Sequence, residues 1–501
     1  MRDQAEAYVP ADLQNFVARL DRLGLVKTIT RPVSLVHEMT EIHRRVLAAG
    51  GPALLFTAPV LADGSVSRMP VLANLFGTRE RIALGLGQHG ADLAGLGALL
   101  AELRQPTPPR DLAGLGRSVP LLQAALNLGT RLVHRPSVQA EVALGEAIDL
   151  TRLPIQWCWP GEPAPLITWP LVVTCSPDDP SDINVGIYRL QLLGRNRLIV
   201  RWLAQRGGAG HHRAWRQHGR DMPIAIAIGA DPALVLAAVM PLPEGMSELD
   251  FAGVLRGQRT RVGRGRTVDL PIPADAEIVI EGTVSAEETA EEGPYGDHTG
   301  YYNAVERFPV VSVSAVTMRR NPIYLSTFTG RPPDEPSVLG EAMTEIFAPI
   351  VRAQFPEIRD IHLPPEACSY RAIVVAIDKR YPGQARRLML GLWSMLPQFT
   401  YAKLIIVVDP DIDVRRWSDV IWALSTRFDA SRDLVRIDDT PIDYLDFASP
   451  QPGLGGKLGL DATNKIGPET TREWGRPLAM PDELVARVDG FWNELGLGGA
   501  P

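Results

Sequence analysis

The chain has 501 residues, and its 51 Lys and Arg against 58 Asp and Glu give a formal net charge of −7. This length predicts about three domains at roughly 150 residues each, and the acidic balance excludes a broad electrostatic attraction to nucleic acid. The three cysteines, of which no two form a CxxC pair, exclude a disulfide framework and a cysteine-based structural zinc site.

The N-terminal part is predicted to be an α/β module. Asp12 is a candidate helix N-cap, apolar residues follow it at helical spacing, and Gly24 ends the helix. Short apolar runs at residues 53–56 and 71–75 predict strands that alternate with further helices. The proline-rich segment 105–109 interrupts this pattern and is predicted to be a linker.

The middle of the chain changes character. It is rich in β-branched and aromatic residues, with few helical stretches between the predicted strands. Many strands with few helices indicate an antiparallel or barrel-like sheet. The predicted strands are residues 167–175, 183–193, 197–203, 224–228, 277–284, 310–318 and 323–328.

The last third returns to alternating strands and helices, which predicts a second α/β layer. A further helix at residues 481–495 follows a loop of glycine and polar residues and is a candidate for docking on a neighbouring subunit. The predicted strands are residues 372–377, 404–408 and 435–437, and the predicted helices are residues 339–353, 383–396 and 414–426.

Several motifs are interpreted as structural. The GxGxxG string at residues 85–90 follows a helix instead of a strand, so it predicts a turn at a helix terminus. Asp409–Asp413 lacks the glycine and glutamate of a calcium loop, and its carboxylates are predicted to cap the next helix. His211-His212 is interpreted as a surface pair. The arginines of residues 256–266 predict a solvated loop or hairpin, with a rim for an anionic ligand as the alternative.

Two acids, Glu292 and Asp297, flank a Gly-Pro-Tyr-Gly turn that can bring both carboxylates to one site. Paired carboxylates suit acid/base chemistry, because each ion raises the pKa of the other and one can hold a proton near neutral pH. The alternative is a solvated acidic turn, since further glutamates directly precede it.

Asn184 and Arg189 are five residues apart, a spacing that puts two side chains on opposite faces of a regular strand. Gly186 is a candidate for a bulge that re-aims one of them. Arg189 has apolar neighbours, and a part-buried arginine normally has a carboxylate partner, for which Glu292 and Asp297 are the candidates. The alternative is an ion pair that only joins two strands.

The segment Arg201–Gly208 holds two arginines, a tryptophan and a pair of glycines. Guanidinium groups bind phosphate, and glycines let the backbone approach a ligand closely. This combination suits a flat ligand that carries a phosphate, although the signal is weak when taken alone.

Together these segments resemble the UbiD family of 3-polyprenyl-4-hydroxybenzoate decarboxylases. The resemblance runs nearly from end to end and keeps the family's segment order. It is carried by residues 50–56, 70–77, 158–160, 164–169, 293–302, 329–336, 441–450 and 459–465.

The resemblance implies a multidomain α/β and α+β fold. Its parts are an N-terminal α/β domain (1–115), a split β-barrel flavin-binding domain (116–335) and a C-terminal α/β oligomerisation domain with a terminal helix (336–501). It also implies prenylated FMN, made by a separate flavin prenyltransferase, and a divalent cation, usually Mn²⁺. Oxygen ligands suit such a cation, and Asn184 and Glu248 match the family's metal positions.

The family's catalytic positions match Arg189, Glu292 and Asp297, with Asp297 at the proton-donor position. One departure is that Gln205 and Gly207 stand where some relatives supply a histidine to the metal. The positions that match the family's cofactor contacts are Ile187, Tyr188, Arg189, Arg201, Trp202, Leu203, Arg206 and Gly207.

The expected reaction is the non-oxidative decarboxylation of 4-hydroxy-3-polyprenylbenzoate to 2-polyprenylphenol in ubiquinone biosynthesis. The alternatives are a decarboxylase of another aromatic or heteroaromatic acid, a non-catalytic scaffold in quinone synthesis, and a hydrolase without flavin. We expect a cytoplasmic homo-oligomer, with a hexamer as one option, and no nucleic-acid partner. Peripheral contact with the inner membrane is a second option for reaching the polyprenyl tail.

Overall fold

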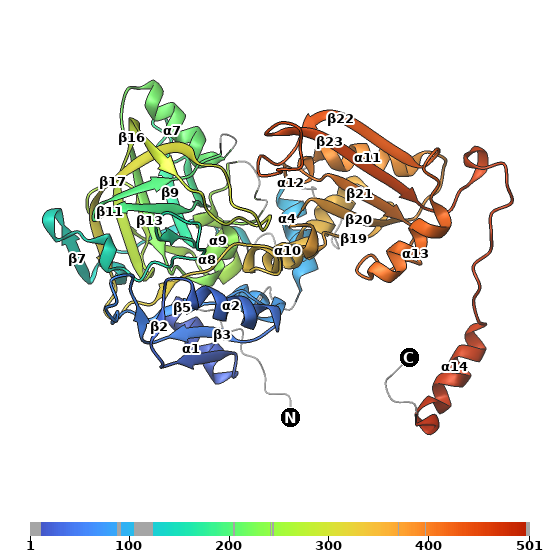
Figure 1. The fold of residues 1–501 in the computed structure, drawn as a ribbon, viewed down its shortest axis with the longest axis horizontal. Coiled ribbons are helices and arrows are strands. Elements are labelled where there is room, and N and C mark those ends of the chain that lie inside the picture. The colour runs from blue at the N-terminus through green and yellow to red at the C-terminus, as the bar shows by residue number, and fades with distance from the viewer. Residues whose placement is uncertain are drawn as a thin grey trace.

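The computed structural model describes residues 12–87, 92–104, 124–203, 206–240, 242, 245–368, 370–395 and 397–496. Figure 1 shows an N-terminal α/β part beneath a strand-rich centre, with a second α/β part beside them. The predicted α/β and α+β multidomain class with a terminal helix is confirmed. The proposed linker at 105–109 and the last residues of the GxGxxG string lie outside the described residues.

The N-terminal part is built on a four-stranded sheet with strand order β1-β3-β5-β18. Helix α1 (Leu13–Arg22) begins after Asp12, which caps it as predicted. The predicted strands at 53–56 and 71–75 are β3 (Ala53–Phe56) and β5 (Val71–Ala73). The fourth strand, β18 (Tyr324–Leu325), comes from far along the chain and pairs in parallel with β5. The sheet is thus completed by the segment that follows the central strands.

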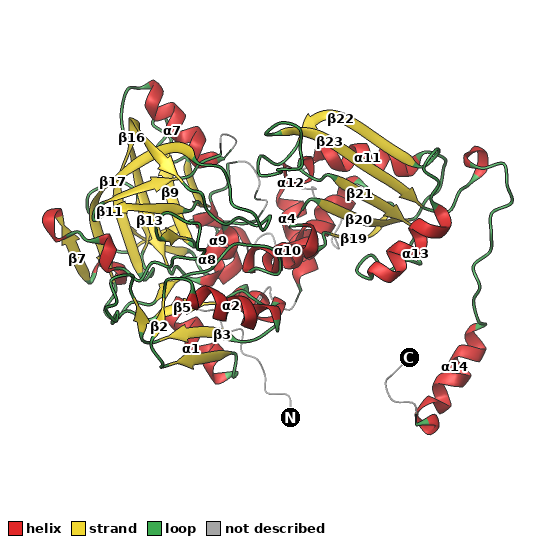
Figure 2. Ribbon diagram, viewed as in Figure 1, coloured by secondary structure: helices red, strands yellow, loops and turns green. Residues whose placement is uncertain are grey.

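The centre is a nine-stranded sheet with strand order β10-β9-β13-β16-β17-β12-β11-β8, and β7 (Glu141–Leu144) pairs with β17. Figure 2 shows strands of this sheet gathered in one part of the molecule. In the described part of the chain the end strands β10 and β8 do not pair, so the sheet does not close into a complete barrel. The strands are β8 (Leu166–Ile167), β9 (Pro170–Cys175), β10 (Ile183–Ile187), β11 (Leu190–Gly194), β12 (Arg197–Val200), β13 (Met222–Ile228), β16 (Ile278–Glu292) and β17 (Glu306–Met318).

Three helices belong to the central part. Helix α7 (Gly207–Gln217) starts after β12, and its opening glycines and two histidines gave no helical signal in the sequence. Helix α8 (Pro232–Ala237) is fully buried and begins at the cap Asp231. Helix α9 (Glu248–Arg256) begins after Ser247, and its first residue lies against β10.

The C-terminal part has a five-stranded sheet with strand order β19-β20-β21-β23-β22, in which β20, β21 and β23 run parallel. The predicted strands at 372–377 and 404–408 are confirmed. The strands are β19 (Ile358–His362), β20 (Ala372–Ile377), β21 (Leu404–Val408), β22 (Leu434–Pro441) and β23 (Leu454–Ala462).

Helices cover this sheet and join it to the rest of the molecule. Helix α10 (Glu335–Gln354) packs against α4 (Leu93–Arg104), between the two halves in Figure 1. Helices α11 (Gln384–Met395) and α13 (Trp417–Arg427) confirm two further predictions.

The terminal helix α14 (Asp482–Phe491) confirms the predicted helix and has no buried residue. Figure 1 shows it standing away from the rest of the chain. Apolar side chains at Val485, Phe491 and Leu495 are exposed. Over the described residues, no helix combines the length and the apolarity that crossing a bilayer requires.

Three motif interpretations are corrected. Asp409 and Asp411 do not cap α13, because both accept hydrogen bonds from Arg427 (2.7 and 2.9 Å). Arg256 is not solvated, since it is buried and pairs with Asp231 at 2.6 Å, although the following residues do form a hairpin. His211 is half-buried at the surface rather than freely solvated, since it is 12% exposed and its Nδ1 lies 2.9 Å from the Thr174 hydroxyl.

Candidate active site

The ends of three central strands bring two arginines to one glutamate. Arg189 lies just before β11, Arg201 just after β12, and Glu292 is the last residue of β16. Glu292 is fully buried and accepts hydrogen bonds from Arg189 Nε at 2.8 Å and from Arg201 Nη1 at 3.2 Å. A fully buried carboxylate requires partners of this kind, because an unpaired buried charge is costly.

Asp297 joins the same cluster through the Gly-Pro-Tyr-Gly turn. Its Oδ2 accepts a hydrogen bond from Arg189 Nη1 at 3.0 Å, so one guanidinium bridges both acids of the motif. Asn303, which the sequence did not single out, accepts from Arg189 Nη2 and from the backbone of Tyr295, both at 2.8 Å. The predicted pairing of Arg189 with Glu292 and Asp297 is therefore confirmed, while the catalytic roles stay a prediction.

The expected bulge at Gly186 is wrong. Strand β10 keeps regular register with β9 through Gly186 and ends at Ile187. Arg189 is re-aimed because it lies in the two-residue link between the end of β10 at Ile187 and the start of β11 at Leu190. Gly186 has another role, since a Cβ there would lie 2.6 Å from the Tyr188 ring. The glycine thus makes room for this tyrosine.

Asn184, Tyr188 and the start of α7 form one side of the site. The Tyr188 hydroxyl lies 3.4 Å from both Asn184 Nδ2 and the backbone nitrogen of Gly208. A Cβ at Gly207 would overlap the Asn184 amide oxygen. Free N–H groups at the start of a helix bind phosphate, and the exposed Arg206 precedes this helix. Gln205 lies outside the described residues.

Glu248 supplies a carboxylate to the same side. Its Oε2 accepts a hydrogen bond from the backbone nitrogen of Val185 at 2.9 Å, next to Asn184. Burial raises the pKa of Glu248 to about 7, and no cationic side chain offsets this. A carboxylate and an amide oxygen without a cation fit a hard divalent ion. No three His, Cys, Asp or Glu side chains of the described chain converge as a metal site, so such an ion would need phosphate or water oxygens as well.

The residues expected to hold a flavin also meet here. Trp202 is buried, its Nε1 has no hydrogen-bond partner among the residues that the structure describes, and a Cβ at Gly208 would lie 2.7 Å from that nitrogen. The Trp202 ring makes an edge contact with Tyr188, with centroids 6.1 Å apart. Ile187 and Leu203 are half-buried beside them. A flat, phosphate-bearing cofactor fits this combination of glycines, aromatic rings and a free donor.

Glu162 is a further residue that the sequence did not reveal. Its carboxylate accepts hydrogen bonds from the backbone nitrogens of Trp159 (3.0 Å) and Gly296 (3.2 Å), which ties the turn of the two acids to another loop. Burial raises the pKa of Glu162 to about 7. A cavity of about 30 Å³ lies against Glu162, Gly296 and Arg189. The only sequence feature that pointed to this loop was the nearby Cys158-Trp-Pro160 string.

The charge state of the cluster is set by His298. Its Nδ1 lies 2.6 Å from Asp297 Oδ1. Burial by itself favours the neutral acid, but the hydrogen bond from His298 and the charge of Arg189 lower the pKa of Asp297 to about 2. Burial opposes the imidazolium as well, yet its contacts with Asp297 and Asp443 raise the pKa of His298 to about 9. At neutral pH the proton therefore resides on His298.

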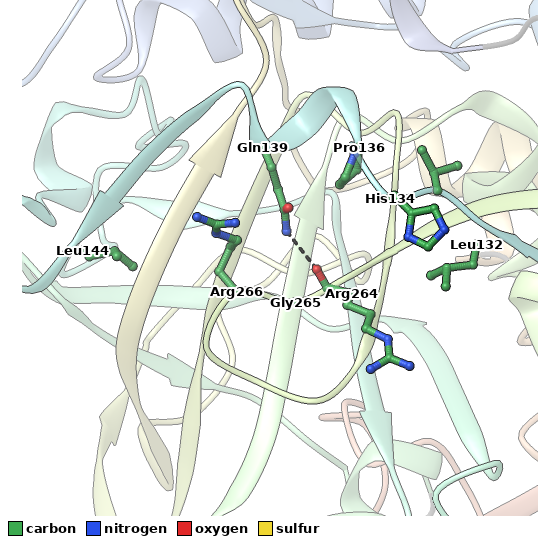
Figure 3. A pocket seen from close by; sticks show the side chains of 9 residues that line it. Leu132, His134, Pro136, Gln139, Leu144, Arg264, Gly265 and Arg266 are labelled. Atoms are coloured by element: carbon green, nitrogen blue, oxygen red, sulfur yellow. Dashed lines mark hydrogen bonds between the residues drawn. The ribbon is translucent and has the colours of Figure 1, made fainter.

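A larger cavity, of about 550 Å³, lies elsewhere, beside β14 (Thr260–Arg264). Figure 3 shows Arg264 and Arg266 at its rim with His134, and Gln139 Nε2 donates to the Arg264 carbonyl at 2.8 Å. None of the predicted site residues lines it. It is therefore separate from the cluster around Arg189.

Models of three domains of one protein family match the chain, each described as part of 3-octaprenyl-4-hydroxybenzoate carboxy-lyase (UbiD). The N-terminal domain model matches residues 17–100, the Rift-related domain model residues 131–332, and the C-terminal domain model residues 337–462. The second match contains Asn184, Arg189 and both acids of the turn.

Solved structures of similar proteins span nearly the whole chain. The UbiD-class enzyme HmfF of Pelotomaculum thermopropionicum, in complex with FMN, is 29% identical with a TM-score of 0.75, over 93% of this chain and 97% of its own. Vanillic acid decarboxylase of Sedimentibacter hydroxybenzoicus in its closed form is 24% identical with a TM-score of 0.82 (98% and 100% covered). The 3,4-dihydroxybenzoic acid decarboxylase of Klebsiella pneumoniae is 23% identical with a TM-score of 0.76 (95% and 99%).

Proposed function

Because the chain belongs to the UbiD family of carboxy-lyases, we propose that it decarboxylates 4-hydroxy-3-polyprenylbenzoate to 2-polyprenylphenol, in ubiquinone biosynthesis, with prenylated FMN. The observation that carries the proposal is the bridge from Arg189 to Glu292 and Asp297, inside the matched central domain and beside residues that fit a flavin. HmfF has been solved with FMN and with prenylated FMN, which supports the cofactor.

Loss of CO₂ from an aromatic ring leaves an electron pair that no side chain can accept, and prenylated FMN supplies that electron sink when bound. The start of α7 and Arg206 would hold its phosphate, with Asn184 and Glu248 as ligands of a divalent cation such as Mn²⁺. Trp202 and Arg201 would hold the ring system.

The cluster of Arg189, Glu292 and Asp297 would bind the substrate and supply the proton. Contacts with Glu292, Asp297 and Asn303 leave one N–H of Arg189 Nη1 for the substrate carboxylate. Glu292 holds Arg189 in place, and Asp297 gives a proton to the ring carbon that loses CO₂. General-acid groups of this kind contribute about 10²–10⁴-fold to rate.

A substitution of Asp297 by Asn tests this assignment. The variant should retain bound flavin, as measured by its absorption spectrum, and lose about 10²–10⁴-fold in turnover. Glu345→Gln, which alters a distant exposed ion pair with Arg79, is the matched control and should keep full activity. Full activity of Asp297→Asn would contradict the role of Asp297.

A second candidate substrate is a small aromatic acid. The relatives from Sedimentibacter and Klebsiella act, by their names, on vanillic and 3,4-dihydroxybenzoic acids. Turnover of 4-hydroxybenzoates with and without a prenyl substituent separates the two: a preference for the prenylated acid supports the ubiquinone reaction, and a preference for the bare acid supports the second candidate.

We also propose a homo-oligomer, with a hexamer as one option, in which α14 docks on a second copy. The support is its lack of buried residues and its exposed Val485, Phe491 and Leu495. A flavin prenyltransferase that supplies the cofactor, a cytoplasmic location and peripheral membrane contact stay predictions, as do the domain boundaries at residues 115 and 335.

A further inference from the structure

His298 connects the acid cluster to the C-terminal part of the chain. Its Nδ1 lies 2.6 Å from Asp297 Oδ1, and its Nε2 lies 3.5 Å from Asp443 Oδ2. Asp297 belongs to the turn after β16, whereas Asp443 lies in the loop after β22. The imidazole therefore stands between two carboxylates from two parts of the molecule.

Asp443 is held firmly at this junction. Its Oδ2 accepts a hydrogen bond from the Tyr370 hydroxyl at 3.0 Å and forms an ion pair with Arg371 Nη2 at 3.0 Å, and its Oδ1 accepts a hydrogen bond from the backbone nitrogen of Leu445 at 2.9 Å. The Tyr370 ring lies beside the imidazole, with centroids 6.2 Å apart. Such contacts fix the orientation of the His298 ring, so that Nδ1 faces Asp297.

The other charged groups around His298 are few. Asp334, the cap of α10, interacts with it electrostatically, and Arg189 lies on the far side of Asp297. The His298 side chain is 16% exposed, although its Nε2 is buried and its Nδ1 faces Asp297. The acids thus outnumber the cations at the imidazole, and a protonated ring is favoured.

We propose that His298, oriented by Asp443, is the positioning residue that returns a proton to Asp297 in each turnover. This role rests on the proposed function. One proton must enter the ring for each CO₂ that leaves. The resting proton is on His298: its Nδ1 passes the proton to Asp297 Oδ1, Asp297 gives it to the ring carbon, and the neutral imidazole then takes up one proton from solvent. The net change is one proton taken from solvent.

A purely structural role is the alternative, in which the imidazole only clamps two parts of the chain together. His298→Asn distinguishes the two roles, because an amide can still donate a hydrogen bond to Asp297 but cannot deliver a proton. Phe447→Ala is the matched control. It removes a ring contact with Tyr301 across the same junction, with centroids 6.2 Å apart, without touching His298.

The experiment is a single turnover of the holoenzyme with 4-hydroxy-3-prenylbenzoate, in which CO₂ and the phenol product are measured separately. In His298→Asn, CO₂ release should keep its wild-type rate, while product formation slows by at least about 10²-fold. Phe447→Ala should slow neither. Equal slowing of both steps, or an unchanged product rate, would overturn the proposal. Absence of CO₂ from the wild type with every aromatic acid would instead refute the proposed function.

A measurement without cofactor or substrate supports the same test. Nuclear magnetic resonance of histidine-labelled full-length protein should show one imidazole that stays protonated above pH 8, a value set by the raised pKa of about 9. This signal should vanish in His298→Asn and titrate at lower pH in Asp443→Asn. A wild-type protein whose histidines are all neutral at pH 8 would overturn the proposal.

Discussion

Replacing Glu292 by Gln removes the charge that two buried arginines share. Glu292 is fully buried, and its oxygens receive Arg189 Nε at 2.8 Å and Arg201 Nη1 at 3.2 Å. Breaking a buried ion pair from one side costs about 3–5 kcal/mol. The loss falls mainly on Arg201, which of the described acidic side chains keeps only Glu306 at 3.6 Å, whereas Arg189 keeps Asp297 at 3.0 Å. At about 2–4 °C per kcal/mol for a domain of this size, the unfolding midpoint should fall by roughly 6–20 °C.

Thermal unfolding of the full-length protein without cofactor, followed by calorimetry, measures this effect apart from catalysis. Glu345→Gln is the control, because its pair with Arg79 is exposed and such pairs contribute less than about 1 kcal/mol. If the Glu292→Gln and Glu345→Gln variants unfold within about 2 °C of each other, the charge of Glu292 does not stabilise the two buried arginines as argued.

Three further outcomes follow from the same structure. Glu248→Gln should abolish retention of Mn²⁺ by the loaded protein, as measured by metal analysis after gel filtration, because Glu248 is the carboxylate beside Asn184; unchanged metal content would contradict this. The pKa of His298 is raised to about 9 in the folded protein. The stabilisation of the folded state by protonated His298 is therefore fully present below the pKa of the unfolded chain, near 6.5, and is lost as the pH rises through 9. The difference in free energy of unfolding between wild type and His298→Asn should therefore shrink over that window, by roughly 3 kcal/mol in total, and a constant difference would contradict it. Deleting residues 477–501 should dissociate the oligomer without unfolding the rest, as measured by light scattering, because no residue of α14 is buried.

The strands with strong apolar runs were predictable from sequence. Ala372–Ile377 and Leu404–Val408 are buried and rich in β-branched residues, so pattern alone set their bounds. Strand β23 was missed because its glycines weaken the strand signal, and one of them, Gly459, makes room for Met389. Helix α7 was missed for a similar reason, since it opens on two glycines.

The acids and arginine of the site were predictable as candidates, since a part-buried Arg189 needs a carboxylate partner. The connection through His298 to Asp443 was not, because it joins residues 145 positions apart in the sequence across two parts of the fold, and only packing brings them together. Glu162 was missed as well, since its partners are backbone nitrogens, which leave no trace in the residue types.

The central claim is that this family member decarboxylates an aromatic acid with prenylated FMN. The direct test is CO₂ release from a 4-hydroxy-3-polyprenylbenzoate by protein purified without oxygen, produced with or without a flavin prenyltransferase. We predict release only from protein that was produced with the prenyltransferase. No release from protein shown to contain prenylated FMN would contradict the proposed substrate, and equal release from flavin-free protein would contradict the cofactor.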